Sequence, residues 1–279
     1  MKAMNSKGWI LFICVFTGLF FSACSDSSDP ESKSYTYYVS NESKAGVTAQ
    51  DIRQKILLAQ MLLPQVAPFV ELVKNDVDVQ KIVYKTTFQN KSIKASGLVY
   101  LPKSPGNYPV LSFQNGTTTE RSKAPSVTGD SEMLFMLQCV ASMGYIVVIP
   151  DYIGFGESSS LPHPYLHAES TTLSILNMLR AMKEFTTEND LPAQPTKDLF
   201  LFGYSQGGWA TLLLQKEIET KGASEFNLKA SASAAGPYSL DYMYGYITTQ
   251  EEYPAPYFTA YLINAYTSLG MVSNPVSDF

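Results

Sequence analysis

The sequence predicts an α/β fold, in which a mostly parallel central sheet is flanked by helices. From Pro109 onward, short apolar runs rich in β-branched and aromatic residues alternate with segments of helical periodicity, which is the pattern of strands joined by crossover helices. The run 145–150 is almost wholly apolar, as a strand buried on both faces should be. With 45% hydrophobic and 16% charged residues, the chain has ample material for one large core.

The first part of this core predicts a helix and then an antiparallel opening of the sheet. Thr48 with Asp51 three residues on is a capping box for a helix that continues to Leu63, beyond which two prolines should break or kink the chain. The runs 81–88 and 95–101 alternate between apolar and polar residues, as two neighbouring antiparallel strands do.

The later elements alternate regularly between strand and helix. In order they are strand 109–114, helix 131–143, strand 145–150, helix 168–185, strand 198–203, helix 206–221 and strand 228–235. Residues 48–237 therefore predict one α/β core. Residues 238–279 are rich in tyrosine and contain no convincing strand, so we interpret them as two or more amphipathic helices that cover the core as a lid.

Residues 1–23 are interpreted as a bacterial export signal that ends at a lipid attachment site. Two lysines precede the apolar run 9–21, which is shorter than the roughly 20 apolar residues of a membrane-spanning helix. The following Phe-Ser-Ala-Cys resembles a lipobox, in which the cysteine, here Cys24, becomes lipid-modified and N-terminal. Residues 24–47 are then a flexible tether. We expect a lipid-anchored protein of the bacterial cell envelope, at the outer membrane or periplasmic side; an ordinary signal peptide is the open alternative.

Charge and cysteine usage exclude several classes of function. The net charge is −5 and no basic cluster is present, which argues against nucleic acid as a partner. Of the three cysteines only Cys139 follows the lipid site, so no internal disulfide is expected in the mature protein. Its apolar neighbours predict a buried core thiol. The sequence contains neither a cluster of His and Cys nor a dinucleotide-binding turn, so neither a metal nor a cofactor is expected.

The strongest chemical signal is the segment 203–208, which reads Gly-Tyr-Ser-Gln-Gly-Gly. An apolar strand runs into it and a helix leaves directly after it, so the chain must turn sharply at Ser205. Side chains at 203 and 207 would collide with neighbouring backbone, which explains the glycines. The turn lifts the Ser205 hydroxyl above the sheet edge, next to a helix N-terminus that favours negative charge, and so predicts a nucleophile. A Gly-rich turn of purely structural function is the alternative.

On these residues the sequence resembles the α/β-hydrolases, and more closely their bacterial esterase and secretory-lipase-like branches, over about residues 81–237. A second feature supports the resemblance. Residues 150–158 (Pro-Asp-Tyr-Ile-Gly-Phe-Gly-Glu-Ser) follow a predicted strand and are similar to the Asp-x-x-Gly-x-Gly-x-Ser turn of those enzymes. By this resemblance, Asp151 is structural and accepts hydrogen bonds from loop amides.

A third feature is the segment 114–119 (Gln-Asn-Gly-Thr-Thr-Thr), which follows the strand 109–114. The family often has His-Gly here and places part of its oxyanion hole on this loop. The resemblance implies that the backbone N–H of Thr117 or Gly116 acts together with that of Gln206 to hold an oxyanion. A polar turn that only caps the strand is the alternative that the residues leave open.

The resemblance also predicts where the partners of the nucleophile should lie. In this family the serine is followed by an acid and then a histidine, each after a later strand. The chain has two histidines, His163 and His167, and both precede Ser205. Six strands are expected here where the family has eight, so we expect a C-terminally truncated chain whose last strands are missing. Two alternatives stay open: either histidine could act as the base, and Asp241, just after the sixth strand, could be the triad acid.

The sequence therefore predicts a serine hydrolase of carboxylic esters, of the esterase or lipase type, that forms an acyl-enzyme on Ser205 and is inactive as this chain. Its partners would be a small-molecule ester and, through the lipid anchor, a membrane. Two other functions are open. A prolyl-oligopeptidase-like serine peptidase would keep the fold and exchange ester for peptide. A non-catalytic pseudo-hydrolase would instead bind a lipid or a glycan.

Overall fold

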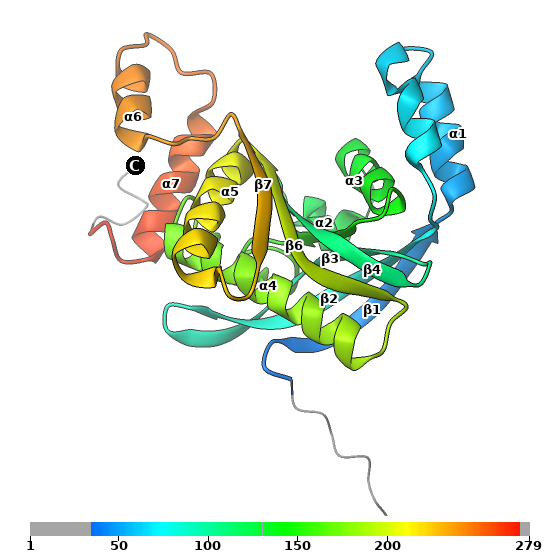
Figure 1. The fold of residues 1–279 in the computed structure, drawn as a ribbon. Coiled ribbons are helices and arrows are strands. Elements are labelled where there is room, and N and C mark those ends of the chain that lie inside the picture. Colours follow the sequence, from blue (N-terminus) through cyan, green and yellow to red (C-terminus); the bar gives the residue numbers. More distant parts are fainter. Residues whose placement is uncertain (1–34, 130, 274–279) are drawn as a thin grey trace, which may run out of the picture. The chain divides into compact units, whose positions relative to one another are not determined.

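The computed structural model describes residues 35–129 and 131–273, and its central feature is a mixed sheet of seven strands (Figure 1). The order across the sheet is β1-β2-β3-β5-β4-β6-β7. Neighbours from β1 to β5 pair antiparallel, and those from β5 to β7 pair parallel. The strands are β1 (Tyr38–Val47), β2 (Val77–Phe88), β3 (Lys91–Pro102), β4 (Gly106–Gln114), β5 (Ile146–Pro150), β6 (Ala193–Tyr204) and β7 (Asn227–Ala234).

Helices cover both faces of this sheet, which confirms the predicted α/β class. The main α-helices are α1 (Ala49–Ala59), α3 (Glu132–Ser142), α4 (Ala168–Glu188), α5 (Gln206–Glu217), α6 (Leu240–Thr248) and α7 (Pro256–Ser268). The other helical segments are the 3₁₀-helices η1 (Pro64–Leu72), η2 (Arg121–Lys123) and η3 (Gly156–Ser158), the four-residue α2 (Pro125–Thr128) and the π-helical η4 (Ile218–Gly222). Helices α4 and α5 pack on one face, and α1 and α3 on the other.

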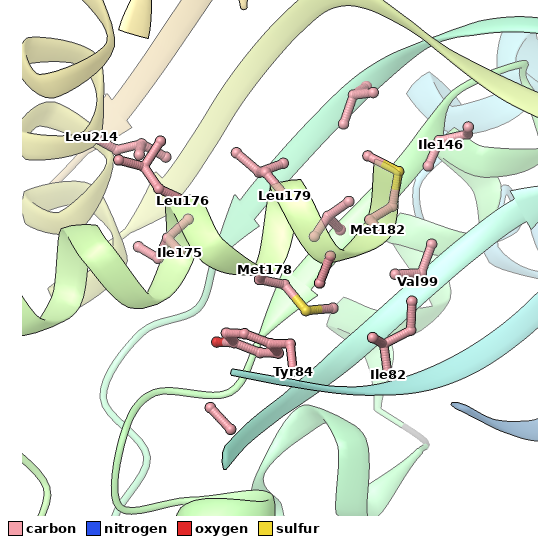
Figure 2. Close-up of a cluster of buried hydrophobic side chains, with 14 of the residues drawn as sticks. Ile82, Tyr84, Val99, Ile146, Ile175, Leu176, Met178, Leu179, Met182 and Leu214 are labelled. Atoms are coloured by element: carbon pink, nitrogen blue, oxygen red, sulfur yellow. The ribbon is translucent and has the colours of Figure 1, made fainter. Parts of the chain in front are cut away.

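The core on the α4 face shows why this segment is a helix. Its apolar residues recur at the spacing of one helix side, and Met178 and Leu179 are fully buried there. Figure 2 shows these side chains pointing toward the sheet, where Ile82, Tyr84 and Val99 lie opposite. Burying a side chain of this size contributes roughly 1.5–3 kcal/mol, so this stripe fixes α4 firmly against the sheet.

Strand β5 is buried on both faces, as its apolar run predicts. Ile146 and Val148 belong to the core on the α4 face, whereas Val147 and Ile149 belong to the core on the α3 face. All four side chains have no exposed surface. Because successive side chains of a strand point to opposite faces, a strand between two layers of helices must be apolar at every position.

The tether predicted for residues 24–47 is wrong for its last part, because Tyr38–Val47 forms the edge strand β1. Strand β1 pairs with β2 from Tyr38 opposite Tyr84 to Val47 opposite Val77. Most of its side chains are exposed or half-buried, so an edge strand of this kind carries no clear apolar alternation in the sequence. Residues before Tyr35, which include the proposed export signal and Cys24, lie outside the described part of the chain.

The helix boundaries follow local chemistry. The Asp51 N–H donates to the Thr48 side chain at 3.0 Å, which confirms the predicted N-cap of α1. That helix ends at Ala59 and not at Leu63, and the chain continues as the 3₁₀-helix η1, which contains two prolines. Two helices, α6 and α7, form after residue 238, as expected.

Cys139 lies on α3 and is only 8% exposed, which confirms the predicted core thiol. Burial raises the pKa of its thiol to about 11, so it stays protonated at neutral pH. Within the described residues, no helix has both the length and the apolar character that crossing a bilayer requires.

Candidate active site

Ser205 lies at the sharp turn between β6 and α5, within the segment 203–208 that we call the elbow. Its backbone has φ +57° and ψ −122°, a conformation that residues with a side chain rarely adopt. The Ser205 N–H donates to Ala234 O at the end of β7 (2.9 Å), and the Trp209 N–H donates to Ser205 O (3.2 Å). These bonds hold a conformation that costs about 1–3 kcal/mol and that is typical of functional sites.

Close packing explains the two glycines of the elbow. A Cβ atom at Gly203 would collide with the carbonyl oxygen of Gly207, and one at Gly207 would collide with that of Gln114. Gln114 is the last residue of β4, which lies beside β6 in parallel register, so strand, turn and helix meet at this point. The predicted reason for the Gly-x-Ser-x-Gly spacing is therefore confirmed.

Ser205 is half-buried and faces a cavity of about 410 Å³. The wall opposite the elbow comes from α6 and α7, which contribute mainly apolar side chains. Cavities of this size and character bind small organic molecules. The position of α6 and α7 fits the covering role predicted for residues 238–279. The lining residues include Tyr165, Leu166, Leu240, Met243, Ile247, Phe258 and Leu262.

The loop after β4, residues 114–119, lies next to the elbow, and we call it the oxyanion loop. A Cβ atom placed on Gly116 would be 3.7 Å from the Cβ of Ser205. The Asn115 side-chain amide donates to Gly116 O (2.9 Å) and approaches Thr118 Oγ1 (3.3 Å). The Asn115 side-chain amide therefore links two other residues of the loop, in place of the histidine that the resemblance leads one to expect.

Gln206 is the first residue of α5 and is fully buried. The first N–H groups of a helix have no acceptor inside the helix. Among the residues that the structure describes, the Gln206 backbone N–H donates to no acceptor. The structure thus brings two of the predicted oxyanion donors, Gly116 and Gln206, next to Ser205, with Thr117 following in the same loop.

His163 is 9% exposed and lies behind the elbow, where both ring nitrogens have partners. Nδ1 lies 2.7 Å from Ile153 O, and Nε2 lies 3.0 Å from the Gln206 side-chain nitrogen. A carbonyl oxygen only accepts, so Nδ1 carries the proton and Nε2 accepts from the Gln206 amide. Burial lowers the pKa of His163 to about 4, so the ring is neutral at physiological pH. This imidazole is engaged in structure and is not directed at Ser205.

Neither His167 nor Asp241 lines the cavity that Ser205 faces. His167 caps α4: its Nδ1 accepts the Ser170 N–H (3.4 Å) and lies 2.9 Å from Ser170 Oγ. Asp241 is exposed in the first turn of α6, and the residues lining the cavity do not include it. Among the described residues, no hydrogen bond joins Ser205 to either histidine.

Asp151 lies in the turn 150–158, which we call the Asp151 turn. Its carboxylate is 1% exposed and accepts the Ser126 N–H (3.0 Å), the Ser96 hydroxyl (2.6 Å) and the Ser126 hydroxyl. Burial raises its pKa, whereas the serine hydrogen bonds act in the opposite direction. A Cβ atom on Gly156 would collide with this carboxylate, which accounts for the glycine. These contacts agree with the structural role that the resemblance implies.

Sequence reasoning missed the tyrosines around His163. Tyr152, Tyr165 and Tyr261 have ring centroids 5.8, 5.9 and 5.9 Å from the imidazole. Tyr261 comes from α7, almost a hundred residues later than His163 in the chain, so no local pattern could place it here. The Pro-His-Pro-Tyr stretch at residues 162–165, which follows the strand β5, was the one available signal.

Comparison with known proteins agrees with the observed fold. Residues 118–237 match the family model for secretory lipases. A rice cell wall degrading esterase, LipA from Xanthomonas oryzae, is 30% identical with a TM-score of 0.63 over 74% of this chain and 52% of that protein. A comparison with curated protein sequences found no match.

Two further structures share the fold. A protein from Legionella pneumophila is 26% identical with a TM-score of 0.73 over 85% of this chain and 62% of its own. Lipase A from Candida antarctica is 18% identical with a TM-score of 0.53, covering 87% of this chain and 50% of that one. The chain thus spans about half to three-fifths of the length of these structures. The chain is of the α/β-hydrolase type, and its residues 118–237 match the family model for secretory lipases.

Proposed function

We propose that the chain provides the nucleophile, oxyanion hole and acyl cavity of a serine hydrolase that acts on carboxylic esters. Ser205 Oγ attacks the acyl carbonyl and the alcohol leaves with a proton, which gives an acyl-enzyme that water then hydrolyses. The observation that carries the proposal is the strained backbone of Ser205, φ +57°, in a glycine-flanked turn that faces an apolar cavity of about 410 Å³.

The oxyanion would be held by backbone N–H groups from two elements. We assign the Gln206 N–H at the start of α5 and the N–H of Gly116 or Thr117 in the oxyanion loop. The position of Gly116 beside the Ser205 Cβ and the free Gln206 N–H among the described residues support this assignment. Removing one such donor in a serine hydrolase costs about 10²–10³ in kcat, so the hole is a major part of the expected catalysis.

None of the described hydrogen bonds gives Ser205 a general base, and we propose that turnover by this chain is low for that reason. A serine hydroxyl is a poor nucleophile at neutral pH unless a base removes its proton. Both nitrogens of His163 are engaged, and His167 caps a helix. Asp241, proposed as triad acid, is exposed on α6 and would need a histidine partner to contribute.

The cavity favours an ester with an apolar acyl group. Leu240 and Met243 of α6, with Phe258 and Leu262 of α7, supply apolar side chains opposite Ser205. This arrangement favours an ester over a peptide, because a peptide substrate also needs partners for its backbone N–H and C=O groups. Hydrolysis of short-chain nitrophenyl esters in preference to aminoacyl-naphthylamides would support the ester assignment, and the reverse order would favour a peptidase.

We further propose that the protein is exported and held by a lipid on Cys24. The lipobox-like residues before Cys24 and the match to a secretory lipase family support export. Metabolic labelling with a fatty acid in the native host should mark the wild-type protein and not Cys24→Ser, and equal labelling of both would contradict the anchor. Membrane association should be lost in the same variant.

A fluorophosphonate probe tests the nucleophile directly. We expect slow, stoichiometric labelling that Ser205→Ala abolishes, and acceleration of nitrophenyl ester hydrolysis by added imidazole, which would replace the missing base. The imidazole effect is measured as the difference between wild type and Ser205→Ala, because imidazole also cleaves these esters unaided. Absence of Ser205-dependent labelling with intact fold would overturn the hydrolase assignment and favour a pseudo-hydrolase. Rapid labelling without imidazole would instead show that a base is already in place.

A further inference from the structure

An aromatic cluster lies behind the elbow, with four buried members and the half-buried Tyr261. We call it the His163 cluster (His163, Tyr152, Phe155, Tyr165 and Tyr261). Phe155 packs edge-on against the imidazole at 5.0 Å between ring centroids. Tyr165 and Tyr261 also contact each other edge-on at 5.4 Å. The cluster therefore joins the Asp151 turn, the segment after it and the helix α7 into one packed unit.

On one side this cluster fixes the side chain of Gln206. The His163 Nε2 accepts from the Gln206 amide nitrogen at 3.0 Å. The other amide atom of Gln206, Oε1, is buried and has no hydrogen-bond partner among the described residues. The contact with His163 is therefore the one hydrogen bond, among the described residues, that orients the fully buried Gln206 side chain. Because the Gln206 backbone N–H adjoins Ser205, this contact also bears on the position of that N–H.

On the other side the same cluster holds the oxyanion loop. The Tyr152 hydroxyl donates to Asn115 O at 2.8 Å, and the Tyr261 hydroxyl donates to Thr118 O at 3.2 Å. The Tyr165 hydroxyl lies 3.1 Å from the Thr117 side-chain hydroxyl. Three tyrosines in contact with one imidazole thus reach three residues of the loop, and the imidazole itself reaches the elbow.

We propose that His163 is a positioning residue that sets the two halves of the oxyanion hole in register, acting through Gln206 and through the tyrosines packed on its ring. The inference rests on the proposed function of Ser205 and its oxyanion hole. Oxyanion donors must lie about 2.7–3.1 Å from the developing negative charge, and a displacement of about 1 Å can cost 10²-fold in rate. A neutral imidazole is suited to this task. Its Nδ1 proton is held by Ile153 O, so its Nε2 accepts from the Gln206 amide, and the ring adds no charge to the site.

The chain offers a matched set of variants for the test. His163→Phe keeps an aromatic ring and removes both hydrogen bonds. His163→Gln supplies one amide donor and one acceptor, the same pair that neutral imidazole provides. His167→Asn alters the other histidine and keeps a side chain that caps helices well. Unfolding midpoints of all three are measured first, so that rates are compared at temperatures where each protein is folded.

The first readout is the second-order rate of Ser205 phosphonylation by a fluorophosphonate probe. We expect His163→Phe to slow this rate at least about tenfold. This is less than the roughly 10²–10³-fold loss in kcat when one oxyanion donor is removed, because the donors are displaced and not deleted. His163→Gln should recover to within about threefold of wild type, and His167→Asn should match wild type. A His163→Gln rate no higher than that of His163→Phe would overturn the positioning role and leave His163 as a packing residue.

The second readout does not depend on reactivity. Hydrogen exchange of the elbow and of the oxyanion loop should accelerate in His163→Phe and not in His167→Asn. In the wild-type protein, the ¹⁵N spectrum of His163 should show a neutral ring protonated at Nδ1, and an Nε2-protonated ring would overturn the inference even if His163→Phe does not fold. If wild-type Ser205 is never labelled, the proposed function fails, whereas exchange and tautomer still decide the positioning role.

Discussion

The elbow and the Asp151 turn are two glycine-containing turns that follow parallel strands, and they use their polar side chains in opposite ways. In the elbow, the Ser205 hydroxyl faces a cavity and makes no hydrogen bond among the described residues. In the Asp151 turn, the carboxylate is 1% exposed and accepts three hydrogen bonds. The glycines are required in both turns because a Cβ atom would collide with a neighbour.

The difference teaches that a glycine-rich turn does not by itself indicate the role of its polar residue. A buried polar group whose hydrogen bonds are all satisfied stabilises the fold and has no capacity left for substrate. A polar group held at the edge of a cavity by a strained backbone is free to react. His163 connects the two turns, since its Nδ1 contacts Ile153 in one and its Nε2 contacts Gln206 in the other.

The largest expected effect is on reactivity at the elbow. Ser205→Ala should remove fluorophosphonate labelling entirely, because no other residue is expected to supply the nucleophile. Its free energy of unfolding should stay within about 0.5 kcal/mol of wild type, since the lost hydroxyl makes no hydrogen bond among the described residues. Labelling and urea unfolding measured on one preparation check both statements. A large loss of stability would instead show that the Ser205 hydroxyl stabilises the fold, as the Asp151 carboxylate does.

The next effect is on stability at the Asp151 turn. Asp151→Ala leaves the Ser126 N–H and two serine hydroxyls without their acceptor in a buried site. Each such group costs roughly 1–3 kcal/mol, so we expect a loss of about 3 kcal/mol or more in the free energy of unfolding. Asp151→Asn retains one acceptor oxygen and should lose less. If Asp151→Ala unfolds within about 1 kcal/mol of wild type, the comparison between the turns breaks down.

A smaller effect concerns the residue that joins the turns, and it depends on pH. Burial lowers the pKa of His163 from 6.5 to about 4 in the folded protein. Between these values the unfolded chain binds a proton that the folded protein does not, so stability decreases as pH falls from 6.5 to 4. The resulting loss in the free energy of unfolding is at most about 3 kcal/mol. His163→Gln has no titrating imidazole at this position and should not show this loss.

Urea unfolding of both proteins at pH 7 and pH 4 measures this term. Asp151, whose pKa burial raises, is present in both proteins, so its contribution cancels when the two pH dependences are subtracted. Parallel pH dependences of wild type and His163→Gln would show that His163 is not held neutral.

The smallest effect is expected at Asp241, outside both turns. This residue is exposed in the first turn of α6, where a carboxylate interacts favourably with the helix dipole. Asp241→Asn should therefore lower stability by only about 0.3–1 kcal/mol and change Ser205 labelling less than twofold. A tenfold loss of labelling at unchanged stability would instead support Asp241 as the triad acid.

Particular residues explain why the fold was predictable in most places. The short, continuous apolar run of β5, whose side chains alternate between the two faces of the sheet, is typical of a strand buried on both faces. The apolar stripe of α4 is a periodic signal of a helix with one buried side. Strand β1 lacked such a signal because an edge strand exposes most of its side chains. Its backbone pairing with β2 and the contact of Tyr38 with Phe185 of α4 join segments that are far apart in the sequence. The sequence also did not predict that α1 ends at Ala59, because apolar residues continue past this point into η1.

The sequence by itself determined the elbow, since the collision of any side chain at Gly203 or Gly207 with nearby backbone leaves a local mark in the residue types. It also determined β5, because a strand that helices cover on both faces is apolar throughout. Only the tertiary structure decided what surrounds Ser205: the cavity beneath α6 and α7, the carboxylate enclosed by Ser96 and Ser126, and the neutral imidazole of His163 against Gln206. These contacts join segments far apart in the chain, and burial and hydrogen-bond satisfaction between distant residues leave no periodic pattern to find.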